Sequence, residues 1–186
     1  MAMAAAACGG KEFTPAAGSA GMPASGGSAG GGTGGSAGSA DLTPPADVGG
    51  EYLVAITNGT NTCSTVSGWT EGQQSTDIPV TLVQDGTMLT GEAGGLAALT
   101  VVLLTGENSF VGEIHGNEFS LTNYGTKAST AGNCTYTVNA VISGTVHGNS
   151  IEGTITYKPA ISDNPDCAPY DCQADQAYSG SRPPPA

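Results

Sequence analysis

The chain has two histidines, His115 and His147, and both lie near acidic residues. Each histidine is the fourth residue of a Gly-x-x-His-Gly-Asn segment, with Glu113 and Glu118 around the first and Glu152 near the second. Imidazole and carboxylate groups bind zinc, but such a site normally needs three protein ligands. The Gly-Asn pairs instead indicate exposed residues beside tight turns. We therefore predict no metal site here, and the two histidines remain weak candidates.

A second group of possible ligands surrounds the last two cysteines and consists of Asp163, Asp166, Asp171 and Asp175. Loops rich in Asp, Asn and backbone carbonyls can bind calcium. The spacing of these aspartates matches no EF-hand loop, so the sequence favours an acidic loop in contact with water. These residues are likewise only weak metal candidates, and we expect no cofactor.

Five cysteines are distributed unevenly: Cys8 stands alone, while Cys63, Cys134, Cys167 and Cys172 belong to the C-terminal part. Four cysteines allow three pairings. Because each of the four lies beside polar, turn-like residues, we expect disulfides. We favour a short Cys167–Cys172 loop with a long-range Cys63–Cys134 bridge. Disulfides indicate an oxidising compartment.

Trp69 is the only tryptophan, and it lies in a Ser-Gly-Trp-Thr-Glu-Gly segment outside any clear strand. We expect it to cover one end of the fold, with stacking on a flat ligand as the alternative. Catalytic motifs with structural context are missing: the nucleophile-elbow matches at 26–30 and 34–38 and the dinucleotide-binding match at 30–35 lie in a glycine-rich tract without a strand or helix. The sequence therefore predicts a protein that is not an enzyme.

The N-terminal quarter of the chain has the composition of a linker. Residues 9–48 consist mostly of Gly, Ala, Ser, Thr and Pro, which cannot bury enough apolar surface to fold. A flexible linker of that length has a root-mean-square reach of roughly 35 Å. We expect a residual signal and attachment segment at 1–8, a disordered tether at 9–48, a β domain at 49–180 and a disordered Pro-rich tail at 181–186.

Ala5-Ala6-Ala7-Cys8 resembles the lipobox of bacterial lipoproteins. This resemblance implies cleavage before Cys8 and attachment of acyl chains to that cysteine. It also implies export and anchoring at the periplasmic or outer cell surface. Stable anchoring requires two or more acyl chains.

The net charge of −12 restricts the partners. An acidic chain repels the phosphate backbone of nucleic acids, so we expect no nucleic-acid binding. It also lacks a basic patch that would attract an anionic membrane, which leaves a lipid anchor as the expected membrane contact.

Alternating apolar residues from Gly49 onward predict an antiparallel all-β domain. Asp85-Gly86 is a strong hairpin signal, and 112–122 repeats at 144–154 as a second strand–turn–strand unit. The apolar run 98–105, rich in valine and flanked by glycines, is expected to be a buried strand rather than a helix. The further strand candidates are 52–56, 78–84, 87–92, 135–143, 150–157 and 173–179.

About eight or nine strands joined by short turns predict a single up-and-down β-barrel, with a β-sandwich as the alternative. In strand count and hairpin order the domain is similar to small lipocalin-like barrels. The first functional hypothesis is an interaction or structural module of the cell envelope. The second is a lipocalin-like carrier of a small apolar ligand, and an envelope hydrolase is a distant third. A carrier requires a cavity of about 300 Å³ or more.

Overall fold

The computed structural model of the protein describes residues 44–63 and 68–184. The expected attachment segment with Cys8, and most of the expected tether, lie outside these residues. The strands are β1 (Gly50–Asn61), β2 (Gln74–Asp85), β3 (Met88–Ala93), β4 (Ser109–His115), β5 (Glu118–Asn123), β6 (Ser129–Ala131), β7 (Cys134–His147), β8 (Ser150–Ala160) and β9 (Ala174–Ser181). The helices are α1 (Gly95–Thr105) and the 3₁₀-helix η1 (Pro165–Tyr170).

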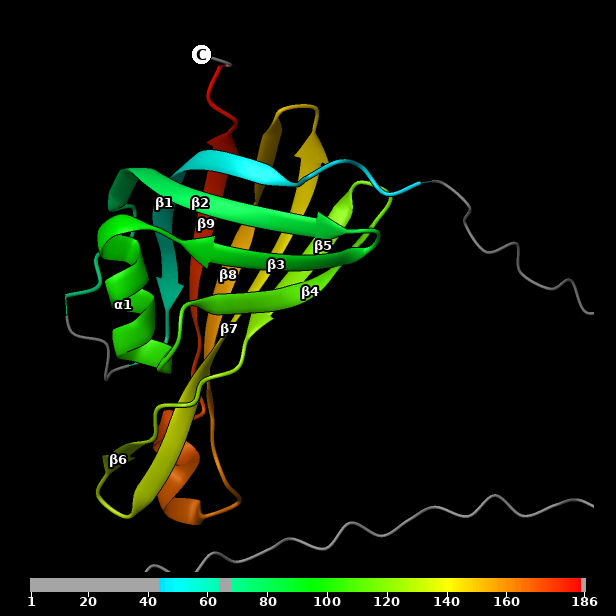
Figure 1. Ribbon diagram of the computed structural model, residues 1–186. Helices are drawn as coiled ribbons and strands as arrows, with labels where there is room; N and C mark the ends of the chain where they lie inside the picture. The colour runs from blue at the N-terminus through cyan, green and yellow to red at the C-terminus, as the bar shows by residue number, and fades with distance from the viewer. Residues whose placement is uncertain (1–43, 64–67, 185–186) are drawn as a thin grey trace, which may run out of the picture. The chain divides into compact units, whose positions relative to one another are not determined.

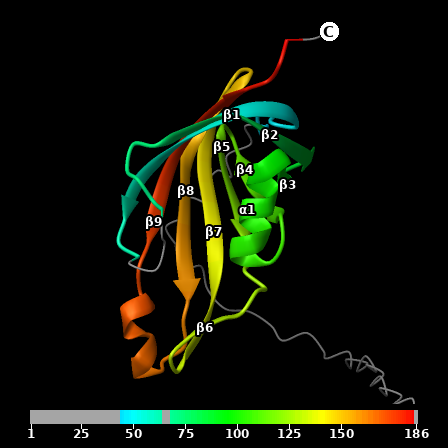
Figure 2. The same cartoon turned by 90° about the vertical axis from the view of Figure 1, so that its left-hand side faces the viewer.

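The strands form a closed antiparallel barrel. Their order is β5-β4-β3-β2-β1-β9-β8-β7, and β5 also pairs with β7, which closes the ring of eight strands. The short strand β6 pairs with the start of β7 outside this ring. Figures 1 and 2 show that β6 and η1 extend beyond one end of the barrel. The prediction of an up-and-down barrel is therefore confirmed, and the sandwich alternative is excluded.

The hairpin turns form where the sequence predicted them. Gly86, Gly116 and Gly148 have φ of 62°, 57° and 62°, a region that favours glycine. The repeated segments are the β4–β5 and β7–β8 hairpins. Their two turns lie side by side, because the amide of Val146 donates a 2.9 Å hydrogen bond to the carbonyl of Asn117.

The prediction of a strand at 98–105 is wrong, because this segment belongs to α1. The helix is apolar on both sides: Val101 is buried, while Leu99 and Leu103 are 59% and 69% exposed. An apolar run without a polar face has no helical period, so periodicity could not separate helix from strand. Gly106, with φ 104°, ends the helix in a left-handed cap, and its amide donates to the carbonyl of Val102.

The predicted cysteine pairing is also wrong. Disulfides join Cys63 to Cys172 and Cys134 to Cys167, in place of Cys63–Cys134 and Cys167–Cys172. The barrel explains the first bridge, because β1 and β9 are neighbours and Asn61 lies opposite Ala174. Cys63 follows Asn61 shortly after the end of β1, and Cys172 shortly precedes Ala174 at the start of β9, so the two cysteines meet.

Val48, Tyr52 and Arg182 close one end of the barrel. Val48 and Tyr52 are 0% and 1% exposed, and the Tyr52 hydroxyl donates to the Val48 carbonyl at 3.1 Å. The Arg182 Nε donates to the Tyr52 hydroxyl at 3.0 Å, and its guanidinium lies 5.5 Å from the Tyr52 ring centre. The folded domain therefore includes Val48 and extends through Arg182.

Candidate functional site: a cavity inside the barrel

A cavity of about 540 Å³ occupies the barrel interior. Its deep part is formed by side chains that point inward from strands on opposite sides of the ring, together with Val101 of α1. They are almost entirely apolar, because inward positions alternate with outward polar ones along each strand. The buried members are Val54, Leu82, Phe110, Phe119, Leu121, Val101, Ile151, Ile155 and Tyr178.

The entrance to the cavity is marked by those lining residues that are exposed to solvent. Among the described residues these belong to two places, the first half of β2 (Ser75, Thr76, Asp77 and Pro79) and the segment from Glu92 through the first turns of α1. Figure 1 shows α1 standing at the ends of β2, β3 and β4. The helix therefore forms one wall of the entrance, at the end opposite Tyr52 and Arg182.

The two ends of α1 are attached to different parts of the barrel. At the N-terminal end, the Gly94 amide donates to the carbonyl of Pro79 on β2 at 2.7 Å. At the C-terminal end, the Lys127 Nζ donates to the Leu103 carbonyl at 2.7 Å, and the Lys127 amide donates to the Thr105 carbonyl at 2.9 Å. The helix thus bridges β2 and the segment that leads to β6 and β7.

A chain of hydrogen bonds lies on the cavity wall opposite α1, where β8, β9 and β1 are adjacent. The Tyr157 hydroxyl donates to Gln176 Oε1 at 3.0 Å, and Gln176 Nε2 donates to Asn58 Oδ1 at 2.8 Å. Asn58 Nδ2 in turn donates to the Thr70 carbonyl at 3.2 Å. Tyr157 and Gln176 both line the cavity, so they place polar atoms on an otherwise apolar wall.

The direction of this chain follows from its last member. A backbone carbonyl accepts hydrogen bonds only, so Thr70 requires the amide nitrogen of Asn58. Asn58 then offers its oxygen to Gln176, and Gln176 offers its oxygen to Tyr157. The Tyr157 hydroxyl is therefore fixed as a donor toward Gln176.

Both tyrosines of the cavity are neutral under ordinary conditions. Burial raises the pKa of Tyr157 to about 12 and raises the pKa of Tyr178 further above the usual range. The cause is desolvation, which disfavours the phenolate. These hydroxyl groups are therefore hydrogen-bonding groups rather than charges.

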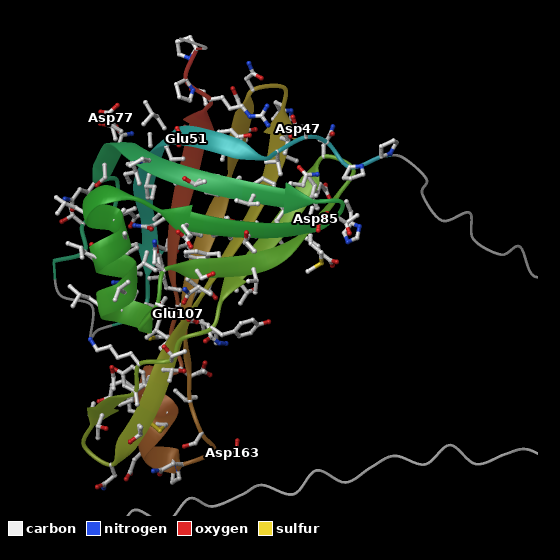
Figure 3. The ribbon with its side chains drawn as sticks, viewed as in Figure 1. Asp47, Glu51, Asp77, Asp85, Glu107 and Asp163 are labelled. Atoms are coloured by element: carbon white, nitrogen blue, oxygen red, sulfur yellow. A yellow bond between two sulfur atoms is a disulfide. The ribbon has the colours of Figure 1, made fainter. Side chains whose placement is uncertain are left out.

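The charges at the cavity are acidic and lie at its entrance. Of the described residues that line the cavity, only Asp77 and Glu92 are charged, and both are exposed. Figure 3 shows Asp77 at the corner above α1. Asp77 also has φ 59° and lies in the bulge between β1 and β2, where the register shifts after Val54. Lys127, Lys158 and Arg182 are outside the lining.

The outer side of α1 is apolar and exposed. Leu96, Leu99 and Leu103 are 82%, 59% and 69% exposed, and Leu96 also lines the cavity. An exposed apolar patch of this kind commonly marks a binding surface. This patch is continuous with the entrance because Leu96 belongs to both.

In the structure each of the two histidines pairs with a different glutamate. His115 Nε2 lies 3.2 Å from Glu113 and His147 Nε2 lies 3.5 Å from Glu152, all with exposed side chains. The side chain of Glu118, at the start of β5, is also exposed. In the described part of the chain, no three His, Cys, Asp or Glu side chains gather as a metal site would require.

The four aspartates are also spread over separate contacts. Asp166 accepts from Asn133 at 2.9 Å, Asp171 lies 3.5 Å from the Lys158 ammonium, and Asp175 accepts from Thr156 at 2.8 Å. Asp163 projects at the far tip beside η1 (Figure 3). None of these four lines the cavity.

Trp69 lies in the loop before β2, and its indole Nε1 donates to the Gly59 carbonyl at 3.0 Å. It is partly buried and is not part of the cavity lining. Its hydrogen bond holds the loop that supplies the Thr70 carbonyl, so Trp69 supports the polar chain indirectly.

Sequence reasoning missed Asn58, Tyr157 and Gln176. The available signal was the alternation along β9, where Ala174 and Tyr178 are 2% and 7% exposed and point inward. Gln176 lies between them on the same face, so its amide also points inward. A glutamine at an inward position of a barrel requires a hydrogen-bond partner, and Tyr157 supplies it.

Comparisons of the chain with protein-family models, with curated proteins and with solved structures find no match. Within the described residues, neither helix has the length and apolar character needed to cross a membrane. The cavity and its surroundings therefore carry the functional argument alone.

Proposed function

We propose that the barrel is a carrier that holds a small apolar ligand in its cavity. The supporting observation is the size and lining of the cavity: about 540 Å³, apolar in depth, with a few polar groups. Ligand sites are typically about 300–1,000 Å³ and combine an apolar lining with a small number of hydrogen-bonding groups. The barrel thus meets the size expected for a carrier.

We also propose that the carrier is a non-enzymatic envelope lipoprotein, anchored by acyl chains on Cys8. The two disulfides are consistent with an oxidising compartment. Mass spectrometry of the protein from its own membrane fraction tests the anchor. A chain that begins at Cys8 and carries added acyl mass is expected, and an unmodified chain that retains residues 1–7 contradicts the anchor.

Binding of a neutral apolar fluorophore, N-phenyl-1-naphthylamine, tests the carrier. We expect a saturable increase in fluorescence with one site per chain. The Ala97→Phe substitution places a ring in the cavity lining and should weaken binding at least tenfold. Leu99→Phe is the matched control, because Leu99 is on the same helix, 59% exposed and outside the lining.

Equal binding by the two variants would place the fluorophore on the outer surface and contradict the carrier. Such a result would favour the second candidate, an interaction module, which the exposed leucines of α1 support. In that case, substitution of Leu99 and Leu103 by serine would remove the fluorophore site while Ala97→Phe would leave it intact.

A further inference from the structure

We infer that the cavity selects uncharged ligands that carry a hydroxyl group, and that a long-chain alcohol binds with its chain in the barrel and its hydroxyl against Tyr157. This inference rests on the proposed carrier function and specifies its ligand class. It follows from three features of the cavity: the direction of the hydrogen-bond chain, the placement of charge, and the position of polar groups relative to the apolar depth.

The hydrogen-bond chain leaves defined groups for a ligand. Tyr157 uses its hydrogen toward Gln176, so its oxygen retains a lone pair that can accept. Gln176 Nε2 uses one hydrogen toward Asn58 and retains a second. An alcohol both donates and accepts, so it can pair with both groups. An ether or a carboxylate has no hydrogen to offer to Tyr157.

The placement of charge disfavours anionic ligands. Asp77 and Glu92 are the only charged side chains among the described residues that line the cavity, and these lining residues include no Lys or Arg. A carboxylate that moves from water into the cavity loses its hydration and finds no cation to compensate its charge. This desolvation is costly. An anionic ligand would also pass two carboxylates at the entrance. A fatty acid is therefore a poorer ligand than the alcohol of equal length.

The position of the polar groups sets the orientation of the ligand. Asn58 follows Thr57, which pairs with Gln74 at the start of β2, so the polar chain lies at the level of the entrance. Phe119 and Ile151 line the cavity beside the hairpin turns at the opposite end. A chain-shaped ligand thus reaches these side chains with its apolar tail while its head stays near Tyr157.

Calorimetric titration of the full chain with decan-1-ol, decyl methyl ether and decanoate at pH 8 tests this inference. The expected result is that decan-1-ol binds at least tenfold more tightly than either of the others. Decanoate binding as tightly as the alcohol would overturn the charge argument, and ether binding as tightly would overturn the donor argument. Failure of all three ligands would instead contradict the carrier function.

The Tyr157→Phe variant tests the proposed contact between the hydroxyl group of the ligand and Tyr157. Removal of the hydroxyl should bring the ratio of alcohol to ether affinity close to one, and this ratio is measured within a single folded variant. Tyr136→Phe is the control, because Tyr136 stacks on Tyr170 at 5.1 Å and does not line the cavity. A ratio in Tyr157→Phe equal to that of the unchanged protein would overturn the assignment.

Discussion

Cys63 and Cys172 lie 109 positions apart in the chain, and their disulfide, with a Cα–Cα distance of 5.0 Å, links the ends of β1 and β9. These are the first and last strands of the barrel, and they pair with each other. The bridge therefore joins the first and last strands of the chain at the end of the barrel where the cavity opens.

Removal of this bridge should destabilise the protein more than removal of the other one. A disulfide restricts the unfolded chain, and the effect grows with loop length, from about 3 kcal/mol for a 15-residue loop to about 4.7 kcal/mol for 100 residues. The Cys63–Cys172 loop spans 109 residues and the Cys134–Cys167 loop spans 33. Chemical denaturation of the two paired Cys→Ala variants measures the difference.

We expect the Cys63→Ala/Cys172→Ala pair to lose roughly 1 kcal/mol more than the Cys134→Ala/Cys167→Ala pair. The second pair serves as the control for loss of buried sulfur, because all four cysteines are buried. A larger loss from the shorter loop would show that packing at η1, rather than chain entropy, determines the contribution of these bridges.

The pairing could not be derived from the sequence because it depends on closure of the barrel. Cys167 and Cys172 are neighbours in the chain, so a local bridge was the simpler expectation. Once β1 and β9 pair, however, Asn61 lies opposite Ala174, and the cysteines next to them must approach each other. The hairpins were predictable because their signals are local, such as Asp85-Gly86, whereas the contact between first and last strands has no local signal.

The difference between local signals and long-range contacts also explains why the sequence did not predict the helix α1 or the cavity. The run 98–105 is apolar throughout, and its surroundings decide its structure: one side meets the barrel entrance through Val101, and the other is exposed. The sequence predicted the barrel but could not decide whether its interior is filled or hollow. The cavity volume depends on how the inward side chains of all the strands pack against one another. Gln176 becomes informative only when β9 is placed beside β8 and β1.

Arg182 is expected to contribute substantially to stability although it follows the last strand. Its side chain donates to the Tyr52 hydroxyl at 3.0 Å and to the Asp47 carbonyl at 2.8 Å, and it is 23% exposed. Hydrogen bonds from charged groups contribute about 1.5–3 kcal/mol. Arg182→Ala should therefore lower the free energy of unfolding by about 2 kcal/mol in urea denaturation.

Lys158→Ala is the matched control for loss of a cation. Lys158 pairs with Asp171 at 3.5 Å, but both side chains are more than half exposed. Exposed ion pairs contribute about 0–1 kcal/mol. An equal effect of the two substitutions would contradict the role assigned to Arg182 at the closed end.

Gly144 on β7 is required by close packing rather than by backbone conformation. A Cβ at this position would collide with the Tyr178 hydroxyl and lie 2.8 Å from the Glu152 carbonyl oxygen and the Phe119 ring. Overpacking of this kind costs about 1–3 kcal/mol. Gly144→Ala should lower the melting temperature, and it should also weaken ligand binding because Tyr178 and Phe119 line the cavity.

Gly49→Ala provides the comparison, because a Cβ there lies 3.6 Å from Gln84 and makes only ordinary contacts. This variant should retain the melting temperature and the affinity for N-phenyl-1-naphthylamine. If Gly144→Ala were equally harmless, Tyr178 would have room to move, and the deep wall of the cavity would be more adaptable than its packing indicates.

Asp175 should make stability depend on pH in the acid range. Hydrogen bonds from Gln173 at 2.9 Å, Thr156 at 2.8 Å and Thr60 at 3.4 Å lower the pKa of this carboxyl. A carboxyl with a lowered pKa in the folded state stabilises the protein above its unfolded pKa of about 4. This stabilisation is lost as the pH falls from about 4 through the folded pKa.

Thermal unfolding of the protein and of Asp175→Asn between pH 2 and pH 7 tests this expectation. The melting temperatures should differ most near pH 7 and converge at low pH, because protonation removes the charge that Gln173 and Thr156 stabilise. Asp163→Asn is the control, since the Asp163 carboxylate is exposed at the far tip beside η1. If the difference in melting temperature between the unchanged protein and Asp175→Asn stays constant down to pH 2, the charge of Asp175 makes no contribution to stability.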